Sequence, residues 1–93
     1  MATVHVNKVT EGWPCADPEG DEALTTIDVT VDGKYVRMGY HENDIASASD
    51  VEQKLTNDSS ILLNADKQKE TPFPDPPGGT DRPEWVPDDF TIS

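Results

Sequence analysis

The fold of this chain is decided by one stretch, residues 27–40, which reads IDVTVDGKYVRMGY. Apolar and polar residues alternate on both sides of Asp32-Gly33, which is the pattern of two strands that bury one face. Asp-Gly favours a two-residue turn of type I′, because both of its positions need a positive φ. The sequence therefore predicts a β-hairpin, and the turn sets its register by pairing Val31 with Lys34.

This register separates an apolar face of the hairpin from a polar one. The predicted pairs are Val29–Val36, Ile27–Met38 and Thr25–Tyr40 on the apolar face, and Thr30–Tyr35 and Asp28–Arg37 on the polar face. The last pair joins opposite charges, and such cross-strand pairs contribute about 0.2–1 kcal/mol to stability. Turn chemistry and residue pattern thus agree on the same hairpin.

Signals on either side of the hairpin predict a mainly β fold of the α+β class. Its parts would be a small antiparallel sheet of three to four strands around the hairpin, one short helix and an extended Pro-rich C-terminal arm. Residues 3–9 read as a further strand with Val4 and Val6 on one face. Residues 11–22 are rich in Gly, Pro and acidic residues and are expected to form a loop.

A helix signal follows the hairpin. Ser49-Asp50-Val51-Glu52 has the form of a capping box, with Ser at the cap and Glu three residues later. We expect a short helix from about Asp50 to Thr56, in which Val51 and Leu55 share one face. Residues 61–63 (Ile-Leu-Leu) are compatible with a fourth strand or with the start of a second helix.

The composition changes at residue 71, so we divide the chain into a β-rich domain, 1–70, and a C-terminal arm, 71–93. Six of the eight prolines lie between Pro72 and Pro87, which excludes a regular helix or a central strand there. Residues 89–93 alternate like a short edge strand. Three of the six aromatic residues nevertheless lie in the arm.

Large rings on a stiff proline-rich arm are typical of anchors that enter pockets on a partner. The predicted partner-binding residues are Phe73, Trp85, Val86, Phe90 and Ile92. The alternative is that the arm wraps its own small domain and covers the core. The sequence leaves both readings open.

The charge is strongly unbalanced, since nineteen acidic residues face seven basic ones in 93 residues, for a net charge of −12. Residues 1–40, 41–70 and 71–93 each carry four more acidic than basic residues, so the charge is spread along the chain. Such a chain repels nucleic acid and anionic membranes, and we expect neither as a direct partner. A salt-rich cytoplasm would screen the repulsion, so the acidity also fits halophilic adaptation.

The core is expected to be small, because only 33% of the residues are hydrophobic. Cys15 is the only cysteine, so an internal disulfide is excluded, and no zinc-ligand pattern is present. Assembly with other subunits is the remaining common route to stability, and we therefore expect an oligomer. Cys15 lacks a base specified by the sequence, and we interpret it as an inert, partly buried thiol.

Two clusters resemble sites without meeting their requirements. The acidic loop 17–22 lacks the Gly and Glu spacing of a calcium loop and is interpreted as a solvated turn. Residues 41–44 (His-Glu-Asn-Asp) could hold a metal only with help from the distant His5, and turn or cap chemistry is the simpler interpretation. We therefore predict no catalytic residue, no metal site and no cofactor.

The resulting hypothesis is a non-enzymatic structural protein, a small acidic module that docks onto protein subunits of a larger assembly, such as a virus particle, through its arm. The first residues lack the pattern of an export signal, so we expect a soluble intracellular or virion protein. The alternative is an acidic inhibitor that mimics nucleic acid in a basic groove. A third, weaker option is an enzyme built around His41, Glu42 and Asp44.

Overall fold

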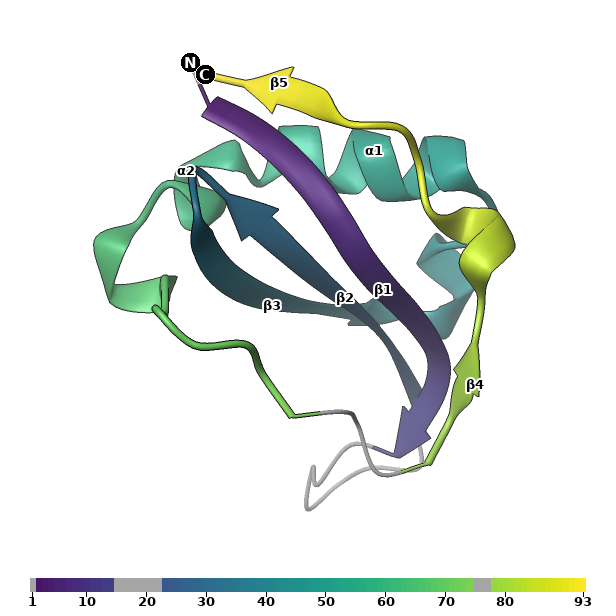
Figure 1. Ribbon diagram of the computed structural model, residues 1–93. Coiled ribbons are helices and arrows are strands. Elements are labelled where there is room, and N and C mark those ends of the chain that lie inside the picture. The colour runs from purple at the N-terminus through teal and green to yellow at the C-terminus, as the bar shows by residue number, and fades with distance from the viewer. Residues whose placement is uncertain (1, 15–22, 75–77) are drawn as a thin grey trace.

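A computed structural model of the chain describes residues 2–14, 23–74 and 78–93. They form an antiparallel five-stranded sheet with helices packed on one face (Figure 1). The strands are β1 (Ala2–Pro14), β2 (Ala23–Val31), β3 (Lys34–His41), β4 (Thr80–Asp81) and β5 (Phe90–Ile92). The helices are α1 (Ala48–Asn57) and α2 (Ser59–Leu62), and the 3-10 turns are η1 (Glu42–Asp44), η2 (Ala65–Lys67) and η3 (Pro83–Trp85).

The hairpin of β2 and β3 confirms the predicted register at every pair. Val31 pairs with Lys34 next to the turn, and Asp28 pairs with Arg37 further along. Asp32 and Gly33 have φ values of 50° and 83°, the left-handed pair that a type I′ turn requires. A two-residue turn of this kind matches the twist of the strands it joins, which explains why the local pattern was sufficient.

β1 is longer than the predicted strand 3–9. The prediction of a loop is wrong for residues 11–14, which continue β1, while residues 15–22, with Cys15 and the acidic cluster, lie outside the described part. Thr10 faces Thr26 and Trp13 faces Leu24, so β1 holds one extra residue between these pairs. Gly12, with a φ of 79°, lies in this bulge. This glycine of the predicted loop therefore marks a bulge within the strand.

The sheet has more strands than the three to four predicted, because the C-terminal segment supplies two short ones. The order is β3-β2-β1, with β4 and β5 both beyond β1. β5 pairs with the start of β1, Ala2 opposite Ile92, and β4 pairs near its other end, Thr10 opposite Asp81. The predicted edge strand in 89–93 is confirmed as β5, and the two chain ends lie side by side in Figure 1.

The predicted helix lies within α1, but its cap is wrong by two residues. Ser47 is the N-cap, and its hydroxyl accepts a hydrogen bond from the Asp50 backbone N–H at 3.2 Å. The Asp50 carboxylate in turn accepts a hydrogen bond from the N–H of Ala46, the residue before the cap, at 3.0 Å, so the reciprocal bond of a capping box is shifted here by one residue. Residues 61–63, left open by the sequence, contain the end of a second helix, since α2 extends to Leu62.

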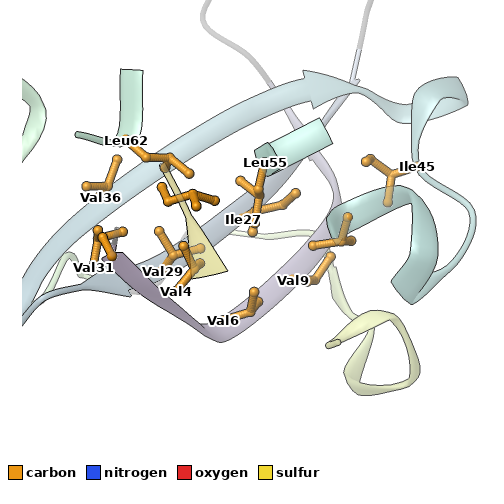
Figure 2. Close-up of a cluster of buried hydrophobic side chains, with 13 residues drawn as sticks. Val4, Val6, Val9, Ile27, Val29, Val31, Val36, Ile45, Leu55 and Leu62 are labelled. Atoms are coloured by element: carbon orange, nitrogen blue, oxygen red, sulfur yellow. The ribbon is translucent and has the colours of Figure 1, made fainter. Parts of the chain in front are cut away.

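The core lies between the sheet and the helices. Figure 2 shows the strand side chains, Val4, Val6 and Val29 among them, directed toward Leu55 and Leu62. Val51 and Leu55 are fully buried, which confirms the shared helix face. The remaining fully or nearly fully buried apolar residues are Ala2, Val9, Ile27, Val31, Val36, Ile45 and Ile92.

None of the helices in the described residues combines the length and the apolar character that crossing a membrane requires.

Candidate functional site

The edge of the sheet at β3 is incompletely paired. β3 pairs with β2 on one side, and on its other side the described residues supply one isolated bridge, between Tyr35 and Lys69. The Tyr35 N–H donates to the Lys69 carbonyl at 2.8 Å, and the Lys69 N–H donates to the Tyr35 carbonyl at 2.9 Å. Because this bridge is antiparallel, the residues that precede Lys69 would continue along β3 if they were extended. They instead form η2 and turn away.

A groove of about 400 Å³ opens where the two segments separate. One wall is β3, from Val36 to Gly39, and the other comes from residues 61–73. Val36 and Met38 of β3 belong to the face that packs on the core, and Ile61 of α2 stands opposite with 40% of its surface exposed. This side of the groove is therefore apolar.

The other side of the groove is cationic and aromatic. Arg37 places its guanidinium carbon 5.0 Å from the centre of the Phe73 ring, and the Lys69 ammonium lies 4.7 Å from the same centre. Cations over a ring are attracted to its negative face by about 0.5–1 kcal/mol at exposed sites. The Arg37 guanidinium also donates to the Pro74 carbonyl oxygen, which ties the Phe73 segment to the sheet.

Two lysines of the groove lack a carboxylate partner among the described residues. Lys67 and Lys69 both line the groove and form no ion pair there, whereas Lys34 lies 3.0 Å from Glu70 and Lys8 lies 3.4 Å from Asp81. Asp66 is the acidic residue of the lining. On a chain of net charge −12, this groove is thus a local concentration of positive charge.

The five residues predicted to bind a partner do not lie together. Phe73 lines the groove at β3. Trp85, Val86 and Phe90 are partly buried against the core, in the C-terminal segment whose strands β4 and β5 pair with β1. Ile92 is only 3% exposed and belongs to the core. These four side chains therefore have packing partners within the chain.

The histidines are far apart along the sheet. His5 is opposite Thr30, which pairs with Tyr35, while His41 lies six residues further along β3, about 20 Å away at strand spacing. His5 instead contacts Asp89, with Nδ1 2.7 Å from Oδ1. Residues 42–44 form η1, in agreement with the predicted turn, and the residues described contain no group of three acidic, His or Cys side chains suited to a metal.

Sequence analysis missed the groove because no single segment contains it. Its two walls come from β3 and from residues 61–73, which are joined by the backbone bridge between Tyr35 and Lys69 and by the contact of Arg37 with the Phe73 ring. One usable signal was present, since Lys67 and Lys69 stand two residues apart in an otherwise acidic chain.

No protein-family model matches the chain, and neither a curated protein nor a solved structure matches it. The groove at β3, with one apolar and one cationic side, is therefore the feature from which a function can be argued.

Proposed function

We propose that this chain is a non-enzymatic assembly module that docks onto protein subunits of a larger complex. The observation that supports it is the edge of β3, where the described residues form no further strand pairing past the Tyr35–Lys69 bridge and a groove lies alongside. An edge strand offers backbone donors and acceptors to another chain, and proteins without such a partner usually cover or block the edge.

The docking surface in this proposal is the β3 edge rather than the end of the arm. Pairing of β5 with β1 and burial of Ile92 give the last residues a role inside the fold. Phe73 is one of the residues predicted to bind a partner, and it also lines the groove, so it remains a proposed partner contact at the β3 edge. Trp85, Val86 and Phe90 keep part of their surface exposed and are proposed as secondary contacts.

A nucleic-acid mimic is less well supported by the geometry. Mimicry needs rows of carboxylates that are free to face a basic groove. Several carboxylates of this chain are instead paired with its own cations, including Glu11 with Arg82 and Asp28 with Arg37. These pairs reduce the charge that a basic partner would meet.

The proposal implies a location inside the cell or within a virus particle, where complexes of this kind assemble. High salt in such a compartment would screen the repulsion between acidic copies or subunits, since the Debye length falls to about 3 Å at about 1 M salt.

Photo-crosslinking in the native host tests this function. A benzophenone amino acid replaces Ile61 in the groove, and in a matched variant it replaces Glu52, an exposed residue of α1 outside the groove lining. We expect discrete protein adducts from position 61 and none from position 52. Further variants carry the benzophenone amino acid in place of Trp85 and Phe90, the proposed secondary contacts. The proposal is wrong if none of positions 61, 85 and 90 gives a discrete adduct and the native chain migrates as a free monomer.

A further inference from the structure

We infer that the groove at β3 receives an extended acidic segment of a partner protein, which adds to the sheet as a strand beside β3. This inference rests on the proposed assembly function and names the chemistry of the partner.

Some backbone N–H and C=O groups at the edge of β3 point away from β2, as pairing with an added strand requires. Val31 and Lys34 are the hydrogen-bonded pair next to a type I′ turn, so in an antiparallel ladder the backbone groups of Tyr35 and Gly39 point away from β2. Tyr35 behaves accordingly, because its N–H and C=O bond to Lys69. Gly39 has the same orientation, is exposed, and has no hydrogen-bond partner among the residues described. It offers one donor and one acceptor to an added strand.

The groove also provides length. The stretch of β3 that lines the groove runs from Val36 to Gly39 and spans about 10 Å at about 3.3 Å per residue. This is room for about four residues of an added strand, which lies within the usual range of about three to ten.

The two sides of the groove specify alternating side chains in the added strand. Side chains that point to the core face meet Met38, which is partly buried, and Ile61, which is 40% exposed, and these two favour apolar residues. Those that point to the opposite face meet Lys69 and the Phe73 ring beneath it, with Lys67 nearby in the lining. Because successive residues of a strand alternate between faces, the segment that fits is alternately apolar and acidic.

Charge favours an acidic partner over a second copy of this chain. Lys67 and Lys69 lack carboxylate partners among the described residues, and an acidic strand would supply them. A second copy that paired through its own β3 would bring another Arg37 to the same face. Each copy also carries a net charge of −12, which opposes association at low salt.

The test uses a synthetic peptide, acetyl-Thr-Glu-Val-Glu-Val-Glu-Thr-amide, and the full ¹⁵N-labelled chain at about 0.05 M salt, where the Debye length exceeds ~10 Å. We expect saturable binding, with amide shifts centred on Gly39 and slower hydrogen exchange of the Gly39 N–H in the complex. A peptide with lysine at each glutamate position is expected not to bind.

Variants separate the charge and backbone contributions. The double variant Lys67→Glu/Lys69→Glu should weaken peptide binding by about tenfold or more. The matched Lys54→Glu variant, which reverses a lysine of α1 outside the groove, should change it by less than about twofold. Gly39→Pro removes the outward N–H without removing a bond to β2, and should abolish binding while the β2–β3 amides keep their shifts.

Three outcomes overturn the inference. They are peptide shifts that map away from β3, equal binding by the lysine peptide, and a dimer in light scattering that protects Gly39 before peptide is added. The last would make a second copy the occupant. If crosslinks from position 61 identify a protein subunit while the acidic peptide fails to bind, the assembly function stands and only the partner chemistry proposed here is wrong.

Discussion

Arg37 and Asp28 face each other across β3 and β2 and form a bidentate ion pair, with Nε 2.6 Å from Oδ1 and Nη2 3.0 Å from Oδ2. Both side chains are largely withdrawn from water, at 15% and 16% exposure. The same guanidinium bonds to the Pro74 carbonyl and lies over Phe73. One cross-strand pair therefore joins the hairpin to the outer wall of the groove.

Removal of one partner of this pair should be costly. Asp28→Ala leaves the Arg37 charge poorly solvated, and we expect the free energy of unfolding to fall by about 2 kcal/mol, below the range for a fully buried pair. Asp28→Ala combined with Arg37→Met should recover much of this loss, because neither charge then remains. Urea unfolding followed by circular dichroism measures both values.

The exposed pair of Lys34 and Glu70 serves as the control. Lys34 holds the pKa of the Glu70 carboxyl below its usual range, but this pair lies in solvent, and Glu70→Ala should leave stability unchanged within error. A loss at Glu70 equal to the loss at Asp28 would show that burial of the Asp28–Arg37 pair is unimportant.

Tyr40 links β3 to the end of α1. Its hydroxyl donates to the Asp58 carboxylate at 2.7 Å, and it is half-buried. Burial, followed by the hydrogen bond and the charge of Asp58, raises the pKa of Tyr40 well above its ordinary value of 10.0. The folded state therefore holds the phenol proton more tightly than the unfolded state does. The resulting stability is complete below pH 10.0 and is lost as the pH rises above it.

Tyr40→Phe should consequently change the alkaline limb of the stability curve. At neutral pH we expect a loss of about 1 kcal/mol, the usual contribution of one hydrogen bond. Above the ordinary tyrosine pKa, the native chain should lose stability by up to about 1.4 kcal/mol per pH unit more steeply than the variant. Urea midpoints measured across that range test this, and parallel curves would contradict it.

The elements that local chemistry determines were predicted from the sequence. The turn at Asp32-Gly33 and the alternation around it fixed all the hairpin pairs, since both depend on residues close together in the chain. The helix face of Val51 and Leu55 followed in the same way. The sequence did not distinguish Ser47 from Ser49 as the helix cap, because an acidic residue follows each of them three positions later.

Features that depend on distant segments could not be predicted. Gly12 adopts a positive φ because it has no Cβ, and β1 continues past it because β2 pairs on both sides of the bulge. The groove exists because η2 turns away from β3 after a single bridge at Lys69, and neither segment alone specifies that separation. The composition of the arm likewise showed that it is rich in aromatic residues, but not that it pairs with β1 at the edge of the sheet.

Ile92 tests whether the C-terminal segment is part of the fold. Its side chain is 3% exposed, and β5 pairs with the first residues of β1. Ile92→Ala should lower the free energy of unfolding by about 2–5 kcal/mol, the range for truncation of a buried aliphatic side chain. Thr91→Ala, at an exposed position of the same strand, should cost less than about 0.5 kcal/mol. Equal effects would mean that β5 does not pack on the core.

Thr25 offers a way to stabilise the chain. It is fully buried on the apolar face of β2, and its hydroxyl has no hydrogen-bond partner among the described residues. A buried hydroxyl without a partner costs about 1–3 kcal/mol, and valine has nearly the same shape without that group. We expect Thr25→Val to raise the free energy of unfolding by about 1 kcal/mol. Thr30→Val is the control, because the Thr30 hydroxyl accepts a hydrogen bond from the Asn7 amide at 2.8 Å and its removal should give no gain. If both valine variants stabilise the chain equally, β propensity rather than the unpaired hydroxyl explains the effect.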